Sequence, residues 1–460
     1  MFRWILAICL WLPAIAQAQD DPWRVFPYLQ NPTRDSMTIV WFSTTPEPGS
    51  LTLIGGSRQE HHKSHPEIIT QLDYGPWEQE KFLGGKPSRP AYRHVVMLQR
   101  LQAGASYQYR VEQSGSLFQS HFRTAPPDQQ AIRFIAYSDC ETEPESTGAR
   151  VSWDDPSSDN KRSYLVDQTE GYAANLKVIR ESNPDFVLIA GDLVETGGEQ
   201  RDWDEFWKHN TCSDGEQSLA SQIPIVAIPG NHEYYAGPRQ GQYGGRESER
   251  AMDKFATYFR VGQNQRYTRL NYGPITILGL DVCNGQPDGS SQDTNLYLAS
   301  NDSQAPDFNP GSLQYLWLEH QLAQARQRSQ FVIVTFHHSP YASGVHGLPP
   351  GSEAGLDKQS GQPTRILFPL LMKYRVDAVI TGHDEMWERS EVSGLDEEGK
   401  PHSIQLWDVG IGGDGLRGPN AKAKNPFLQF LAHRDSPERW QGPRLVDGGK
   451  HYGHLEVEIV

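Results

Sequence analysis

The chain contains few cysteines, and they lack the paired spacing that zinc-binding or redox-active thiols require. Four occur in 460 residues, Cys9, Cys140, Cys212 and Cys283, and no two of them are separated by two residues. A zinc ribbon and a dithiol redox centre are therefore excluded. An exported protein could join two of the last three cysteines in a disulfide, and the sequence leaves the pair undefined.

Long apolar stretches are absent after the first residues. Arg3 precedes the apolar residues 4–12, and Ala16-Gln17-Ala18 fits a small-x-small cleavage site. This pattern predicts a signal peptide over residues 1–18, because the apolar stretch is too short to span a bilayer. The mature chain is then expected to be soluble and secreted, with the periplasm as its compartment and with no membrane anchor.

Basic residues are outnumbered. The 42 lysines and arginines stand against 57 aspartates and glutamates, which gives a formal net charge of −15. Removal of residues 1–18 takes away Arg3 and no acidic residue, so the charge becomes −16. This balance argues against binding of nucleic acid through its phosphates. An anionic substrate would have to be attracted by cations at the site itself.

Residues 22–124 are predicted to form an all-β sandwich. They contain segments rich in β-branched and aromatic residues, separated by turn signals: "DSMTIVWFST", "AYRHVVMLQRLQAGASYQYRVEQ" and "LFQSHFRT". Residues 124–130, "TAPPDQQ", are predicted to be a linker, because paired prolines end strands and helices. We expect the sandwich to pack against the next domain rather than to carry a site, since it shows no reactive cluster.

Residues 131–460 are predicted to form an α/β domain. Apolar runs such as "DFVLIAGD" and "QFVIVTFHHSP" alternate with segments of helical period, including residues 164–183 and a helix with Ser312 as its N-cap. Continuous apolar strands that alternate with helices indicate buried sheet with helices on both faces.

Five apolar runs in this domain end in side chains that commonly bind metals. They are Asp139 in "AYSDCE", Asp192 in "AGDLVE", Asn231-His232 in "PGNHE", His337-His338 in "TFHHSP" and His383-Asp384-Glu385 in "TGHDE". One aspartate after a strand is usually a turn residue, and one histidine is usually a hydrogen-bonded core or surface residue. Five such ends should converge at the carboxyl edge of a sheet, where only a metal cluster would balance their charge.

These segments resemble the ordered motifs of the calcineurin-like metallophosphoesterases. The matching motifs are "SDCE", "GDLVE", "GNHE", "HHSP" and "GHDEMWERS", and "PYLQNPTRDSMTIVWFST" resembles the start of the N-terminal domain of purple acid phosphatases. The resemblance spans nearly the whole mature chain. It implies a fibronectin- or immunoglobulin-like sandwich followed by a four-layer αββα catalytic domain around two metal ions.

The resemblance also implies roles for individual residues. Asp192 would bridge the two ions, and Asp139 would bind the first of them. His232 would contact the substrate and protonate the leaving group.

The second ion would be bound by Asn231, His338 and His383, again by resemblance. His338 is preferred to His337 because the ligand of the family lies two residues before a proline, here Pro340.

The chain departs from the family around the first ion. Glutamate stands at three positions where relatives carry tyrosine or histidine: Glu195, Glu385 and Glu141. Glu385 is expected to bind the first ion, and the sequence leaves open whether Glu141 or Glu195 does so. Such an oxygen-rich position suits Mg²⁺, Mn²⁺ or Ca²⁺, whereas the second suits Zn²⁺, Fe or Mn²⁺.

The expected function is hydrolysis of phosphate monoesters or diesters by hydroxide that two divalent or trivalent ions activate. The expected partner is a small phosphorylated substrate, and the oligomeric state is undefined. The alternative is a degenerate phosphoesterase that binds phosphate or a partner without turnover, because three replaced ligands could leave one ion or none.

Overall fold

The structure is a computed structural model. It describes residues 21–460 apart from residues 56–57, 147–150, 155–162, 167, 240–244, 261–265, 284–304, 351–358, 415, 433–438, 442–443 and 448–450. The predicted signal peptide lies outside the described residues. Among the residues that are described, no helix is long and apolar enough to cross a membrane.

The N-terminal part is a sandwich of two four-stranded antiparallel sheets, as the sequence predicts. One sheet has the order β1 (Trp23–Gln30), β2 (Ser36–Ser43), β6 (Tyr92–Gln99), β5 (Glu67–Ile68). The other has the order β4 (Arg58–Lys63), β3 (Ser50–Gly55), β7 (Ser106–Gln113), β8 (Ser116–Arg123). Buried and exposed residues alternate along β7, because one face of its sheet meets the sandwich core and the other meets solvent.

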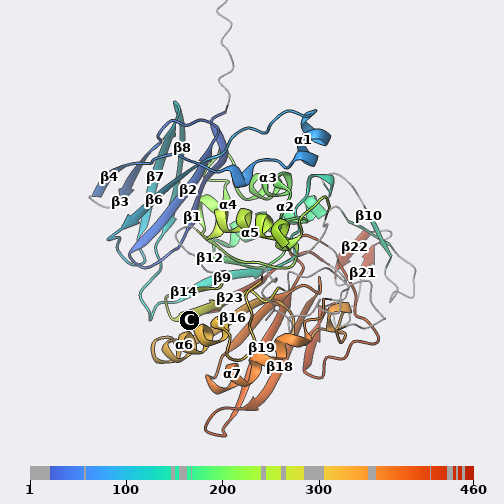
Figure 1. Ribbon diagram of the computed structural model, residues 1–460. Coiled ribbons are helices and arrows are strands. Elements are labelled where there is room, and N and C mark those ends of the chain that lie inside the picture. Colours follow the sequence, from blue (N-terminus) through green and yellow to red (C-terminus); the bar gives the residue numbers. More distant parts are fainter. Residues whose placement is uncertain are drawn as a thin grey trace, which may run out of the picture.

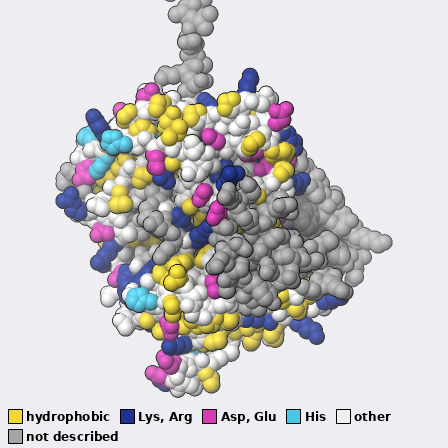
Figure 2. Space-filling model, in the orientation of Figure 1, with side chains coloured by type: hydrophobic (Ala, Val, Ile, Leu, Met, Phe, Trp, Pro, Cys, Tyr) yellow, Lys and Arg dark blue, Asp and Glu magenta, His cyan; other side chains and the backbone are white. Residues whose placement is uncertain are grey.

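The edge strand β4 carries polar and charged side chains. His61 and His62 lie on it, and histidines gather at this outer end of the sandwich (Figure 2). A polar, charged edge disfavours pairing with a strand of another chain.

The sheet that contains β1 and β2 is buried on both faces along much of these two strands. Its strand β2 is buried at seven of eight positions, which explains the continuous apolar run "TIVWF". The ring of Tyr28 in β1 lies 4.2 Å from that of Trp207 in α3 (Gln200–Asn210), and its hydroxyl donates to the carbonyl of Tyr258 in α5 (Gly245–Phe259) at 3.1 Å. This sheet therefore shares a core with the α/β part, and the sandwich packs against it (Figure 1).

A short arm leaves the sandwich between β5 and β6. It contains η1 (Thr70–Leu72) and α1 (Pro76–Leu83) and extends over α3 (Figure 1). Glu78 accepts a hydrogen bond from the backbone of Arg201 at 3.1 Å, and the Tyr74 hydroxyl donates to Asp204 at 2.9 Å. The sequence did not predict this arm, because its glycine, proline and charged residues have no clear period.

The α/β part contains two sheets. The smaller has the order β13 (Ile225–Ile228), β12 (Phe186–Ala190), β9 (Ile132–Tyr137), β23 (Leu455–Ile459), with β9, β12 and β13 parallel and β23 antiparallel. The larger has the order β14 (Thr268–Tyr272), β15 (Ile275–Gly279), β16 (Phe331–His338), β17 (Ala378–Gly382), β19 (Pro401–Val409), β18 (Trp387–Leu395), β20 (Leu428–Leu431). Small hairpins pair β10 (Val151–Asp154) with β11 (Ser163–Val166) and β21 (Arg439–Gln441) with β22 (Arg444–Asp447).

Helices cover the outer faces of both sheets, so the α/β part has four layers (Figure 1). On the side of the smaller sheet lie α2 (Gln168–Ser182), α3, α4 (Leu219–Gln222) and α5, and on the side of the larger sheet lie α6 (Leu313–Arg328) and α7 (Phe368–Lys373). The hydroxyl of Ser312 accepts from the backbone N–H of Tyr315 at 3.2 Å, so the predicted N-cap is confirmed. Short 3₁₀ turns complete the described elements: η2 (Pro144–Ser146), η3 (His232–Tyr234), η5 (Val345–Gly347) and η6 (Gln362–Leu367).

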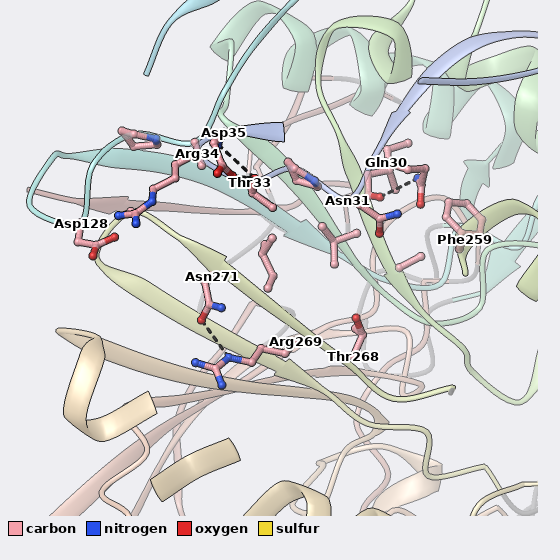
Figure 3. A pocket seen from close by; sticks show the side chains of 18 of the residues that line it. Gln30, Asn31, Thr33, Arg34, Asp35, Asp128, Phe259, Thr268, Arg269 and Asn271 are labelled. Atoms are coloured by element: carbon pink, nitrogen blue, oxygen red, sulfur yellow. Dashed lines mark hydrogen bonds between the residues drawn. The ribbon is translucent and has the colours of Figure 1, made fainter. Parts of the chain in front are cut away.

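A cavity of about 570 Å³ lies where the sandwich, the linker and the strands β13 and β14 meet (Figure 3). Gln30 and Arg260 on its wall donate to the outer carbonyls of Ile225 and Ala227, at 3.2 and 2.9 Å. These bonds cover the free edge of β13. None of the described residues that line the cavity is a predicted metal ligand.

Cys140, Cys212 and Cys283 are free thiols in the structure, the first and last of them buried. The disulfide that export would permit is therefore not formed between any of these three residues.

Tyr28 provides a test of the packing between the two parts. We expect Tyr28→Ala to lower the free energy of unfolding by about 3–5 kcal/mol, as for other buried aromatic truncations. Tyr28→Phe, which keeps the ring and loses one hydrogen bond, should cost only about 1 kcal/mol. Urea unfolding measures both. A Tyr28→Ala protein that unfolds at the wild-type urea concentration would show that this contact adds nothing to stability.

Candidate metal centre

The five polar strand ends converge, but they come from two sheets rather than one. Asp139, Asp192 and Asn231 follow β9, β12 and β13 of the smaller sheet, whereas His338 and His383 belong to the ends of β16 and β17 in the larger sheet. The single edge expected from the residues alone was therefore wrong. The carboxyl ends of the strands in the two sheets meet because β12 packs against β16 and β17.

The backbone at this junction is unusually strained. Left-handed φ angles are uncommon for residues other than glycine and each costs free energy. Five of them occur here: Asp139 (56°), Glu141 (31°), Asp192 (53°), His383 (77°) and Glu385 (45°). Strain that gathers in one place indicates a functional site, because the surrounding structure has to hold these side chains in position.

Asp192 lies at the middle of the centre and is 1% exposed. Its Oδ1 accepts from the backbone N–H of His232 at 2.9 Å, and its Oδ2 lies 2.8 Å from Nε2 of His337. Burial alone would raise the pKa of Asp192, but the nearby imidazoles of His337 and His232 outweigh it and lower that pKa. The carboxylate therefore stays ionised in the absence of water.

Glu233 holds the turn that carries Asp192. Its carboxylate accepts from the backbone N–H groups of Gly230, Asp192 and Leu193, at 2.6, 3.0 and 2.8 Å. Burial, followed by the charge of Asp192, raises the pKa of Glu233 to about 7. Residue 230 has to be glycine here, since a Cβ would collide with the carboxylate of Asp192.

Three imidazoles form the side of the centre that is predicted to bind the second ion. Nδ1 of His337 donates to the carbonyl of Ala190 at 2.8 Å, and Nε2 of the protonated ring forms an ion pair with the carboxylate of Asp192 at 2.8 Å, so that only loss of this proton frees Nε2 for an ion. Nε2 of His383 donates to the carbonyl of Gln359 at 2.8 Å, and the His338 and His383 ring centroids are 4.2 Å apart. Atoms of Asp192, His337 and His383 are close enough to hold one ion.

His338, the predicted ligand, is buried beside this group. Its Nε2 is bonded to Oε1 of Gln359 at 3.1 Å, and its Nδ1 has no hydrogen-bond partner among the described residues. Burial lowers the pKa of His338 to about 3, and that of His383 also falls, first through burial. The ligand role of His338 stays a prediction. His337, which the sequence did not favour, is the histidine whose ligand atom lies with those of Asp192 and His383.

Carboxylates form the side of the centre that is predicted to bind the first ion. Atoms of Glu141, Glu385 and Asp414 lie within 4.8 Å of one another, and those of Glu141, Asp192 and His232 form a further group. Burial, followed by Asp414 and then the other glutamates, raises the pKa of Glu141. Nη2 of Arg417 lies 2.6 Å from Oε1 of Glu385.

The donor set fits metal ions. Three atoms of the predicted ligands are buried and have no hydrogen-bond partner among the described residues: Oδ1 of Asn231, Nδ1 of His338 and Oε2 of Glu385. The amide of Asn231 donates through Nδ2 to Tyr235 at 3.3 Å, which leaves Oδ1 free as a ligand. Neutral imidazoles and ionised carboxylates are the forms that bind metals.

Sequence reasoning missed Asp414, Arg417 and Gln359. Asp414 and Arg417 lie in the glycine-rich "GIGGDGLRG" after β19, and Gln359 lies in residues 345–362; both segments were interpreted as loops. His232, which the sequence predicted as a site residue, lies at the centre with its Nδ1 2.8 Å from the carbonyl of Glu195.

Comparison with known proteins now identifies the family. Residues 132–384 match the calcineurin-like phosphoesterase family, and residues 22–124 match the purple acid phosphatase N-terminal domain. The chain belongs to the calcineurin-like phosphoesterase family. A purple acid phosphatase from yellow lupin has the same fold, with a TM-score of 0.62 at 19% identity over 90% of this chain and 68% of that one.

Several relatives are similar in sequence. Purple acid phosphatase 18 of Arabidopsis thaliana is 24% identical, over 94% of this chain and 83% of its own length. An uncharacterized protein of Mycobacterium tuberculosis is 27% identical over 58% of this chain, which spans about half (45%) of that relative. A probable inactive purple acid phosphatase 27 of Arabidopsis thaliana is 23% identical, over 77% of this chain and 53% of its own length.

The protonation of His337 predicts how the metal-free protein responds to pH. Burial lowers the pKa of His337, but Asp192 outweighs it and raises this pKa to about 9, against about 6.5 in an unfolded chain. The stability that the protonated ring contributes is complete below pH ~6.5 and is lost as the pH rises towards ~9. In EDTA, thermal unfolding should show this loss in the wild type, with a shallower slope for His337→Gln. Equal slopes would contradict the Asp192–His337 interaction.

Proposed function

We propose that the protein is a metal-dependent phosphoesterase that hydrolyses phosphate monoesters or diesters at a centre for two ions around Asp192. The observation that carries this proposal is the position of Asp192, whose ligand atoms lie within 4.8 Å of those of His337 and His383 and also of those of Glu141. A carboxylate common to two neighbouring groups can bridge two ions. The catalytic unit would be residues 131–460, preceded by the sandwich at 22–124.

The chain's own residues would bind the ions from opposite sides. Asp139 and Glu385 would bind one ion, and Asn231, His338 and His383 would bind the other. Two ions held there would supply a water activated near neutral pH and would neutralise charge on the phosphoryl group.

His232 is placed to give a proton to the leaving group. Its Nδ1 is fixed on the carbonyl of Glu195, and its Nε2 lies 4.0 Å from Oδ2 of Asp192. Burial lowers the pKa of His232, but the charges of Asp192 and Glu195 outweigh it and raise that pKa. A protonated imidazole beside the bridging carboxylate is a suitable general acid for an alkoxide.

Arg417 supplies the local positive charge that the acidic chain requires. Its side chain is 35% exposed and lies next to Glu385. An anionic ester could therefore contact its guanidinium on entering the centre. We further propose a secreted, periplasmic protein, because of the signal-like residues 1–18.

The alternative of a binding protein without turnover has one specific observation in its favour. The guanidinium of Arg417 already neutralises Glu385 in part, where relatives carry a histidine ligand. If this ion pair replaced the first ion, phosphate binding would persist without hydrolysis.

Asp192→Asn tests the proposal directly. We expect hydrolysis of p-nitrophenyl phosphate and its bis-ester, assayed with Mn²⁺, Mg²⁺, Zn²⁺ or Ca²⁺, to fall far more than the ~10–100-fold typical of an outer-shell partner. Asp35→Asn, at an exposed residue of the sandwich, is the control. Wild-type protein without turnover under any ion, or a fully active Asp192→Asn, would contradict the proposal.

His232→Asn separates proton donation from ion binding. Loss of the general acid should lower kcat for an alkyl phosphate by about 10²–10⁴-fold, and for p-nitrophenyl phosphate much less, because nitrophenolate leaves without a proton. Equal losses for both esters would show that His232 does not protonate the leaving group.

A further inference from the structure

We infer that Glu141, Glu385 and Asp414 form an all-carboxylate site that selects an oxygen-preferring divalent cation, of which Ca²⁺ is the clearest probe. The three offer ligand oxygens within 4.8 Å of one another, with Glu141 and Glu385 buried and Asp414 half-buried. This inference rests on the proposed function, which places two ions at the centre. It concerns the binding of one of these ions, and binding can be measured without hydrolysis.

A free ligand atom points to a cation at this place. Oε2 of Glu385 is buried and has no hydrogen-bond partner among the described residues, although Oε1 of the same carboxylate is bound by Arg417. Leaving a buried carboxylate oxygen without a partner is costly. A cation contacting Oε2, Glu141 and Asp414 removes that cost.

The balance of charge also favours a divalent ion. The guanidinium of Arg417 contacts Glu385 through Nη2 at 2.6 Å and Nε2 of His346 through Nη1 at 3.0 Å, and Nδ1 of His232 lies 3.7 Å from Oε2 of Glu141. The imidazole of His232 is shared among Glu141, Asp192 and Glu195, so negative charge is in excess at the three carboxylates of the site. A divalent cation balances this excess, whereas adjacent carboxylates without one repel each other.

The loop that carries Asp414 is fixed to the centre by its backbone. The N–H groups of Gly413 and Asp414 donate to the carbonyl of Asp139 at 3.0 and 2.8 Å, and that of Gly412 donates to the carbonyl of Ser138 at 2.8 Å. Residue 412 has to be glycine, since a Cβ would collide with that carbonyl. Asp414 is thus positioned by the same strand end that positions Asp139.

The two sides of the centre therefore differ in ligand chemistry. The carboxylate side offers oxygen alone, which is the ligand set of Ca²⁺, Mg²⁺ and Mn²⁺. The side formed by His337 or His338, His383 and Asn231 offers imidazole nitrogen, which suits Zn²⁺. We expect Ca²⁺ to bind the carboxylate side and Zn²⁺ to bind the histidine side of the same molecule.

Titration calorimetry with two variants tests this assignment. Metal-free wild type should bind one Ca²⁺ after the histidine side has been filled with one Zn²⁺. Asp414→Asn should weaken Ca²⁺ binding at least tenfold and leave Zn²⁺ binding unchanged. His383→Ala should do the reverse, and Glu141→Gln should repeat the effect of Asp414→Asn. Circular dichroism verifies that each variant is folded.

The outcomes separate this inference from the proposed function. Wild type that binds no Ca²⁺ at millimolar concentration, or Asp414→Asn that binds it as wild type does, overturns the inference even if the protein hydrolyses esters. Selective loss of Ca²⁺ in Asp414→Asn supports the inference even if hydrolysis is absent, in which case only the proposed function fails.

Discussion

The buried charge of Asp192 constrains the arrangement of the whole centre. A carboxylate that is 1% exposed is stable only if hydrogen bonds and positive charge replace the water it has lost. The backbone of His232 and the ring of His337 supply these, from two different sheets. Glu233 in turn fixes the strained turn of Asp192. The face-to-face packing of the two sheets at this point is thus coupled to the ionisation of one residue.

Around that carboxylate the centre divides into two chemical sides. The ends of β13, β16 and β17 bring an amide and imidazoles, and the ends of β9, β17 and β19 bring the carboxylates of Glu141, Glu385 and Asp414. Under the inference above, unlike ions would occupy the two sides. Arg417 lies on the acidic side, where it provides an exposed cation on a chain with a net charge of −15. Capture of an anionic ester would therefore depend on the centre rather than on the surface.

The strands, the layers and the five polar ends could be predicted because apolar runs and their polar terminations are local properties of the sequence. The choice between His337 and His338 could not. Neighbouring residues of a strand point to opposite faces of the sheet. The register of β16 against β17 shifts between Thr335 and His338. The alternation of side-chain direction along β16 therefore does not show which of the two histidines faces the centre. Asp414 was also missed, since its place depends on backbone bonds to Asp139 far away in sequence.

The number of ions bound per chain tests the central claim most directly. Native mass spectrometry of protein loaded with Mn²⁺ and then dialysed would count them, with Asp192→Asn measured alongside. A dinuclear centre built around a shared carboxylate predicts two ions per wild-type chain and a loss of at least one in the variant. One ion or none in the wild type, or two in the variant, would contradict the account.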